Sequence, residues 1–206
     1  MPNFDEILTS FILLWAVIDP IGTVPVFLAV TRQHPDWEKN HVAIISILVA
    51  AGILSFFLVA GQLLLEAMHI PLAAFQVSGG IILFLFSLTM IFGQSKPEEE
   101  MQMARSKKET AIFPLAVPSI ASPGAIMAIM LLTDNHRFSI AHQVVTGSVM
   151  LFILGITLVF LLFARFINKV LGDTGASIIS RVMGLILSAV AANSVLIGVT
   201  AYIHQK

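Results

Sequence analysis

One acidic residue, Asp19, lies deep inside a long run of apolar residues. A carboxylate within a bilayer is costly, and such groups usually line a pathway or pair with a cation. Two interpretations stay open: the carboxylate binds a substrate ammonium, a coupling cation or a proton, or it only caps a broken helix. The two roles are compatible. Glu66 and Asp134, by contrast, lie at the ends of apolar runs, where they can reach the interface.

Two of the apolar runs contain prolines at the same spacing. Pro20 and Pro25 interrupt the first, and Pro118 and Pro123 interrupt a later one, with five residues from one proline to the next. Proline removes a backbone donor and clashes with the carbonyl one turn back, so both helices should open. In lipid, an opened backbone must face protein or a watery cavity. The prolines therefore predict two broken helices around an internal polar site.

Each break also carries a signal for restarting the helix. Asp19 precedes Pro20 and Ser122 precedes Pro123, and both pairs suit the N-cap and first helical positions. A helix N-terminus carries partial positive charge, which suits an anionic group such as a carboxylate.

Other polar residues near the breaks are ambiguous. The hydroxyls at these positions can replace lost backbone bonds or contact a substrate, and Asn193 can line a cavity or bond to another helix. The candidate substrate-binding residues are Asp19, Pro20, Gly22, Thr23, Pro25, Pro118, Ser119, Ser122, Pro123, Gly124 and Asn193.

The composition places the chain in a membrane. Hydrophobic residues make up 57% and charged residues 11% of the 206 positions, and the mean hydropathy is +0.95. A soluble domain averages about 25% charged residues. The net charge of −1 offers no basic field for nucleic acid. We therefore expect membrane lipid around the chain and no nucleic-acid partner.

The fold class follows from apolar runs long enough to cross a bilayer core about 30 Å thick. An unbroken apolar stretch such as 81–86 lacks the alternation of a membrane barrel. We expect an all-α protein with six transmembrane helices, of which the first and fourth are broken. The predicted spans are 7–31, 41–65, 72–92, 111–132, 141–163 and 177–203.

The distribution of cations predicts the topology. Of the 11 Lys and Arg residues, all but Arg137 and Lys206 lie in the odd-numbered connections or at their edges. Cytoplasmic loops carry the excess of positive charge. This predicts a multi-pass protein of the cytoplasmic (inner) membrane with both termini outside.

The chain also divides into two similar halves. Residues 1–93 and 111–206 each hold three spans, joined by the polar cytoplasmic linker 94–110. Gly80 begins an apolar stretch that resembles the one at Gly184. Because each half has an odd number of spans, the second must be inverted relative to the first. Inverted repeats with interrupted helices at matching positions are typical of transporters that bind at the midplane. For the glycines at 79 and 80, close helix packing is the leading interpretation.

No pattern points to an enzyme or a cofactor. Aspartyl proteolysis needs a second buried Asp, and a serine hydrolase needs a base beside Ser119 or Ser122; neither is found. The histidines lie at span ends without metal-ligand clustering. We expect neither an enzyme nor a bound cofactor, only a coupling ion, H⁺ or Na⁺.

Four blocks resemble the MarC family of bacterial and archaeal inner-membrane proteins. They are 19–27 (DPIGTVPVF), 78–84 (SGGIILF), 113–118 (FPLAVP) and 181–187 (RVMGLIL), in family order along the whole chain. The resemblance implies a relationship to LysE-type exporters and transport of small neutral amino acids such as glycine and alanine. One departure is Ser122-Pro123, where the family often has Gly-Pro.

We therefore expect a secondary transporter of a small neutral amino acid, driven by a proton or sodium gradient. One buried acid and no buried Lys or Arg favour a neutral zwitterion. The alternatives are a carrier of another small solute or a metal ion, or a non-transporting membrane scaffold. Small residues on several spans could also support a homo-oligomer.

Overall fold

The computed structural model describes residues 4–31, 34–92, 115–134 and 138–204, and within those ranges the chain is helical, without strands. The all-helical prediction is confirmed. The predicted linker 94–110 lies outside the described residues. In chain order, the elements are α1 (Phe4–Ile18), α2 (Pro20–Val30), α3 (Asp36–Ala67), α4 (Leu72–Phe92), the short π-helical η1 (Leu115–Ile120), α7 (Pro123–Leu132), α8 (Ile140–Leu162) and α9 (Ala164–His204).

Five of the described segments are long and apolar enough to cross a membrane, and they match five of the six predicted runs. They are Phe4–Val30, Trp37–Ala67, Ala73–Phe92, Ile140–Leu162 and Thr174–His204. The described part of the predicted run 111–132 consists of η1 and α7. Neither is long enough to span alone, because a new helix starts at Pro123.

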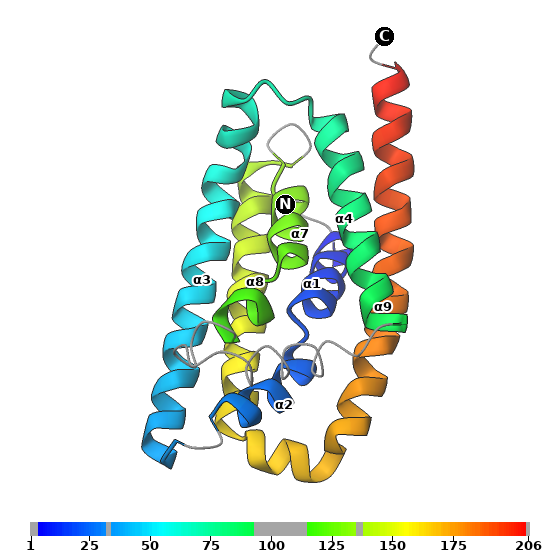
Figure 1. Cartoon of the computed structure of the whole chain (residues 1–206). Coiled ribbons are helices and arrows are strands. Elements are labelled where there is room, and N and C mark those ends of the chain that lie inside the picture. The colour runs from blue at the N-terminus through cyan, green and yellow to red at the C-terminus, as the bar shows by residue number, and fades with distance from the viewer. Residues whose placement is uncertain (1–3, 32–33, 93–114, 135–137, 205–206) are drawn as a thin grey trace.

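The last span, Thr174–His204, begins close to the predicted 177. The connection before it, which includes Arg165 and Lys169, is itself helical and forms the first part of α9. It contains neither Gly nor Pro until Gly172. There φ is 67° and ψ is 171°, a conformation that favours glycine. The helix turns at this point from a segment across one end of the molecule into the long span (Figure 1).

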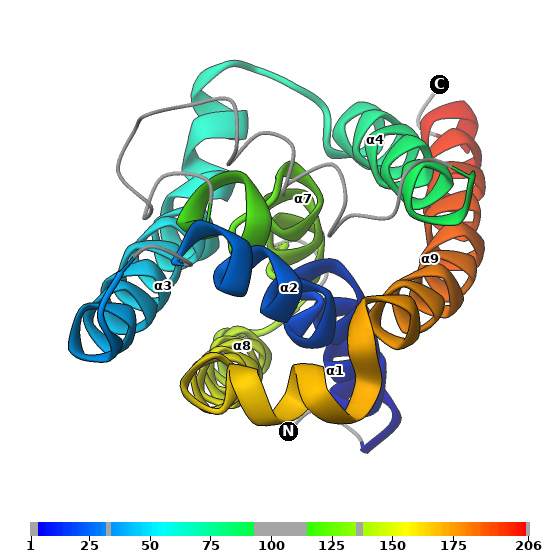
Figure 2. The ribbon, with the colours of Figure 1, turned by 60° about the horizontal axis from the view of Figure 1, so that its bottom comes forward.

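The helices form three groups when seen towards one end of the bundle. Helices α4 and α9 lie side by side, α3 and α8 lie on the other side, and α1, α2 and α7 lie between the two pairs (Figure 2). Helices α1 and α2 contact α8 and α9, whereas α7 contacts α3 and α4 as well as α1. The central segments are thus held by long helices from both halves of the chain.

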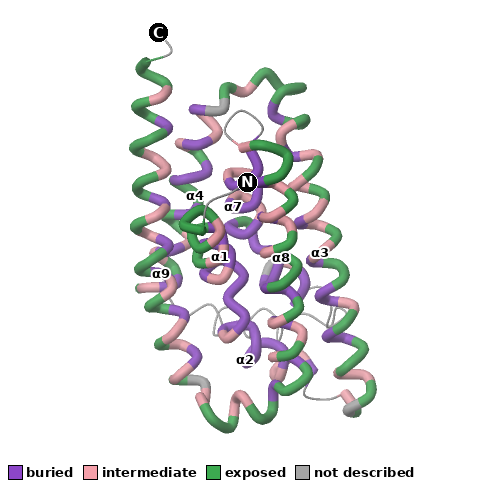
Figure 3. Tube along the Cα trace, turned by 180° about the vertical axis from the view of Figure 1, so that it is seen from behind, coloured by how far each residue is buried: buried purple, intermediate pink, exposed green. Residues whose placement is uncertain are grey.

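The interrupted segments form the core. In Phe4–Val30, 72% of the most apolar stretch is buried, against 22–33% in the other four spans. Figure 3 shows this burial concentrated along α1, α2 and α7. The long helices expose large apolar side chains outward, including Leu48, Leu85 and Phe152. Such a surface suits lipid as its solvent.

Glycines bring the backbones of α4 and α9 together. A Cβ on Gly80 would lie 3.1 Å from the carbonyl oxygen of Ala191, and a Cβ on Gly184 would lie 3.2 Å from that of Ser87. These contacts are reciprocal, because Gly184 is as far from Gly80 in sequence as Ala191 is from Ser87. Close packing, the leading interpretation of Gly80, is confirmed. A third glycine, Gly198, approaches the start of α4 in the same way.

Candidate binding site at the helix breaks

The first break lies between α1 and α2, at Asp19. Its backbone adopts φ 51° and ψ 68°, a left-handed conformation that Asp tolerates better than most residues. The helix ends at Ile18 and restarts at Pro20, as the proline pattern predicts. The Oδ1 atom of Asp19 accepts the N–H of Gly22 at 3.0 Å. Asp19 is therefore the N-cap of α2.

The second oxygen of this carboxylate is bound by another helix. The hydroxyl of Ser180, on α9, donates to Oδ2 of Asp19 at 2.7 Å. Asp19 is only 2% exposed. Gly22 permits this contact, because a Cβ there would lie 2.7 Å from the Ser180 hydroxyl and would collide with the carboxylate. The first break is thus a sealed polar contact between α1, α2 and α9.

The second break lies between η1 and α7. Val117 is extended inside η1, with φ −138° and ψ 122°. Ser122 is also extended, and its Oγ accepts the N–H of Ala125 at 3.1 Å. Pro123 is the first residue of α7. Ser122 therefore caps α7 by the same i to i+3 bond with which Asp19 caps α2.

The two breaks meet. The Ser122 hydroxyl donates to the carbonyl oxygen of Val17 at 3.4 Å. That carbonyl belongs to the last turn of α1, where carbonyl groups lack a full set of intrahelical donors. Contacts between α1 and α7 and between α2 and η1 complete the junction. Segments more than 100 residues apart are therefore joined at their interruptions.

Two further buried hydroxyls at the breaks, those of Thr23 and Ser119, differ from each other in their hydrogen bonding. Thr23 is fully buried, and its Oγ1 donates to the carbonyl oxygen of Asp19 at 2.9 Å. Ser119 is also fully buried, but its Oγ has no hydrogen-bond partner among the described residues. A buried polar group without a partner is uncommon and marks a place for a water molecule or a ligand. Of the predicted hydroxyls, Ser119 is the one that remains available.

The structure does not bring every predicted site residue to the breaks. Pro25 lies inside α2, whereas Pro118 directly follows the extended Val117 at the kink within η1; α2 and α7 restart at Pro20 and Pro123. Asp19-Pro20 in the first half therefore corresponds to Ser122-Pro123 in the second. Pro20 does not correspond to Pro118, although each is the first proline of its run. Gly124 is buried, and a Cβ there would lie 3.0 Å from the ring of Phe86.

Asn193 lies apart from the breaks. Its side chain is on the exposed side of α9, about 20 Å along the helix from Ser180. An amide in the middle of an apolar run suggests a cavity only if its helical face points inward. The buried positions of α9 nearby include Leu187 and Ala191, and Asn193 is not on their face.

Sequence reasoning missed two residues. Ser180 was not identified, although it shares a buried face of α9 with Gly184, Leu187 and Ala191 at spacings of three and four residues. A helical-face analysis could have found it. Asp134, expected to reach the interface, is only 1% exposed.

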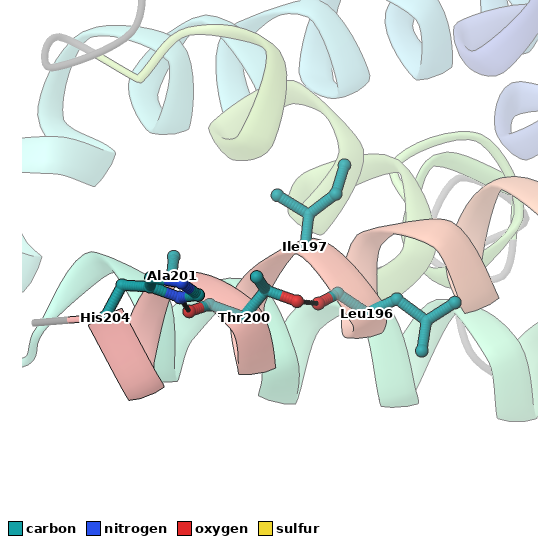
Figure 4. A pocket seen from close by; sticks show the side chains of 5 residues that line it. All are labelled: Leu196, Ile197, Thr200, Ala201 and His204. Carbon is teal, nitrogen blue, oxygen red and sulfur yellow. Dashed lines mark hydrogen bonds between the residues drawn. The ribbon is translucent and has the colours of Figure 1, made fainter.

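A hollow beside the C-terminal end of α9 is unrelated to the breaks. It has a volume of about 520 Å³ and is lined by Leu196, Ile197, Thr200, Ala201 and His204. Figure 4 shows that its polar groups face their own helix: Thr200 donates to the Leu196 carbonyl at 2.8 Å, and Nδ1 of His204 lies 2.8 Å from the Thr200 carbonyl. This surface therefore offers mainly apolar contact. Among the described residues, no group of three or more His, Cys, Asp or Glu could hold a metal ion.

Comparison with known proteins agrees with this architecture. Residues 4–203 match the family described as MarC family integral membrane protein. The UPF0056 membrane protein MJ1677 of Methanocaldococcus jannaschii is 35% identical over 92% of this chain and 94% of its own. The UPF0056 inner membrane protein YhgN of Escherichia coli is 31% identical over 95% and 96%, respectively. No solved structure matches. The chain therefore belongs to the MarC family and is an integral membrane protein.

Proposed function

We propose that this protein is a secondary transporter of a small neutral amino acid, such as glycine or alanine, driven by a proton or sodium gradient. The observation that carries the proposal is the junction of two interrupted helices around a buried carboxylate. Ser122 touches the last turn of α1 at 3.4 Å, immediately before Asp19. Paired interruptions of this kind are typical of transporter sites.

The chemistry of the junction suits a zwitterion. The N-terminus of α7 and the unpartnered Ser119 hydroxyl can bind a carboxylate. Asp19 can bind an ammonium group or the coupling ion. Among the described buried residues, the charged or titratable ones are Asp19, Asp134 and His142, with no Lys or Arg. An extra anionic or cationic group on the substrate would therefore lack a matching partner.

Ion binding at Asp19 requires a rearrangement. Both carboxylate oxygens already accept hydrogen bonds, from Gly22 and from Ser180. A cation or a proton must compete with the Ser180 hydroxyl for Oδ2. Because Ser180 belongs to α9, this competition couples the charge state of Asp19 to the contact between α2 and α9.

Two inverted repeats supply the proposed mechanism of alternating access. Their support is the reciprocal glycine packing of α4 and α9 and the matching caps at Asp19 and Ser122. The contacts of α1 and α2 with α8 and α9 correspond to those of α7 with α3 and α4. Rocking of one repeat against the other would expose the junction to each side in turn.

The proposed location is the inner membrane, with both termini outside. The distribution of cations supports this orientation, and the Escherichia coli relative is named an inner membrane protein. A C-terminal fusion to a reporter that fluoresces only in the cytoplasm should stay dark. A bright fusion would reverse the orientation.

Gradient-driven flux tests the proposal. Purified protein in proteoliposomes should accumulate labelled glycine or alanine when a proton or sodium gradient is imposed. Asp19→Asn should reduce this flux at least tenfold, while Glu66→Gln, which changes an exposed acid at the end of α3, should transport as the wild type does. Equal gradient-driven flux in wild type and Asp19→Asn would remove Asp19 from the mechanism, and absence of flux would reject the transporter.

A further inference from the structure

The first part of α9 runs in a different direction from the spans on either side of it. This crossing segment, 164–171, begins after the end of α8 and ends at the turn at Gly172. It lies across one end of the molecule (Figures 1 and 2). Helix α8 has 23 residues, about 34 Å, which is enough to cross the bilayer core. The crossing segment that follows α8 therefore lies at the membrane surface.

The exposed side of the crossing segment carries two strips of different chemistry. Phe166 and Val170, four residues apart, are each 67% exposed. Arg165 and Lys169, also four residues apart, are exposed as well. Residues four apart share a helical face, and consecutive residues are rotated by about 100°, so the apolar strip and the cationic strip lie next to each other. Interfacial helices use such a pattern to place apolar side chains among acyl chains and cations at the headgroups.

A hollow next to Arg165 extends the cationic strip to α3. Its volume is about 210 Å³, and it is bordered by the ends of α2 and α8 and the starts of α3 and α9. Lys39, Asn40 and Arg165 line one part of it, and apolar side chains such as Phe27 and Leu162 line the rest. Its described lining includes no Asp or Glu. The hollow is thus both cationic and apolar, which suits a ligand that is both anionic and apolar.

The two cations of the hollow can bind an anion in addition to their contacts within the protein. Lys39 and Arg165 both interact with other groups of the chain. An ammonium has three N–H donors and a guanidinium has five, so each can keep an internal contact and still donate to a phosphate oxygen. Arginine also fits phosphate oxygens with two parallel hydrogen bonds. Since like charges from α3 and α9 border the same hollow, an anion there would reduce their repulsion.

Trp37 indicates the depth of the hollow in the membrane. It lies in the first turn of α3 and is 72% exposed. Tryptophan is enriched at the level of the lipid headgroups. Lys39 lies about 3 Å further along the helix axis, so it is close to the same level. The hollow is therefore at the depth of the lipid phosphates.

We propose that the hollow and the crossing segment together bind an anionic phospholipid. Its phosphate binds to Lys39 and Arg165, Lys169 adds attraction, and its acyl chains lie along Phe166 and Val170. A soluble phosphate would use the cations alone, whereas the exposed apolar strip favours a lipid. Both connections lie on the side predicted to be cytoplasmic, where the leaflet surface is negative. The bound lipid would link the start of α3 to the start of α9, and this binding does not depend on transport.

Native mass spectrometry of the purified full chain can measure the affinity for single lipids. Dioleoyl-phosphatidylglycerol should bind at least about tenfold more tightly than dioleoyl-phosphatidylcholine, which has the same chains and no net charge. Glycerol 3-phosphate, which has a phosphate without the chains, should not displace the lipid. Equal affinity for the two lipids would overturn the proposal. Displacement by glycerol 3-phosphate would overturn it too, because the site would then bind soluble phosphates.

Charge variants test whether the hollow is the site. Lys39→Gln and Arg165→Gln should each weaken phosphatidylglycerol binding about fivefold, the effect of one cation near the headgroups, and leave phosphatidylcholine binding unchanged. Arg181→Gln is the matched control, because it removes an exposed cation of α9 that does not line the hollow; its affinity should equal that of the wild type. Equal losses in all three variants would show diffuse attraction and overturn the proposal.

Folding of the variants is checked before their affinities are compared. Each must elute as a single species with the thermal midpoint of the wild type. If neither Lys39→Gln nor Arg165→Gln does, Lys169→Gln on the exposed cationic strip replaces them. Wild-type affinity for phosphatidylglycerol in the folded charge variants would overturn the proposal, whatever the outcome of the flux measurements.

Discussion

The two helix breaks perform the same task with different groups. At the first, the Asp19 carboxylate caps α2 from a left-handed backbone conformation and is tied to Ser180 on α9. At the second, the Ser122 hydroxyl caps α7 from an ordinary extended conformation and contacts Val17. A carboxylate can lose its charge or exchange a hydroxyl donor for a cation, whereas a serine hydroxyl cannot ionise at physiological pH. The first break can therefore respond to ions, whereas the second can only hold α7 in position.

The largest expected effect comes from filling the space beside the first cap. In Gly22→Ala, the new Cβ would collide with the carboxylate and lie 2.7 Å from the Ser180 hydroxyl. We expect a loss of about 3 kcal/mol in the free energy of unfolding, measured by equilibrium unfolding in mixed micelles. Gly52→Ala is the control, because nothing lies within 4 Å of its Cβ; it should not destabilise the protein.

The equivalent change at the second break tests whether the two breaks differ in how tightly they are packed. In Gly124→Ala, the Cβ would approach only the edge of the Phe86 ring, at 3.0 Å. A ring can shift more readily than a capping carboxylate, so we expect a loss of about 1 kcal/mol. A loss as large as that of Gly22→Ala would mean that both breaks are equally tightly packed.

The next largest effect on stability is expected at the hydrogen bond between Ser180 and Asp19, which has no counterpart at the second break. Ser180→Ala leaves Oδ2 of Asp19 buried without its donor, which should cost about 2 kcal/mol. Ser188→Ala is a matched control on the same helix, since its hydroxyl donates only to the Leu185 carbonyl in its own turn. Equal unfolding free energies for the two variants would show that the Asp19–Ser180 contact contributes nothing.

A smaller effect is expected at the second cap. Ser122→Ala removes the acceptor for the Ala125 N–H and the donor to Val17. Loss of a helix cap costs about 1 kcal/mol. Ser139→Ala removes the exposed cap of α8 and should cost less, because water can replace that hydroxyl. Equilibrium unfolding titrations of the two variants measure both losses in free energy of unfolding.

The smallest effect on stability is expected for Asp19→Asn. Asparagine tolerates the left-handed conformation and can still accept the Gly22 N–H, and its amide can donate to Ser180. Unfolding free energy should therefore fall by less than about 1 kcal/mol, although transport should be lost. A large loss of stability would instead assign Asp19 a mainly structural role.

Local signals in the sequence predicted much of this architecture. The apolar run 72–92 matches α4 residue for residue. The pairs Asp19-Pro20 and Ser122-Pro123 identified both helix starts, because a capping group and a proline act on the next turn alone. The fourth predicted span, the inverted repeat and the substrate remain predictions.

Contacts between distant segments could not be predicted in this way. Ser180 is 161 residues from Asp19 in sequence, and nothing near either residue specifies the other. The burial of Asp134 and the exposure of Asn193 depend equally on how helices face their neighbours. Helical character before Gly172 was missed because Arg165 and Lys169 were read as marking a loop. Positive charge in a connection bears on the predicted side of the membrane and not on the backbone conformation.

The glycines shared by α4 and α9 affect how this pair resists separation in lipid. Each glycine directs a Cα–H towards a carbonyl oxygen of the opposite helix, a geometry of weak hydrogen bonds. Acyl chains offer no donor to replace these bonds, and no side chain is present to fill a gap between the backbones. Separating α4 from α9 in lipid should therefore cost more than separating two helices that pack only through side chains.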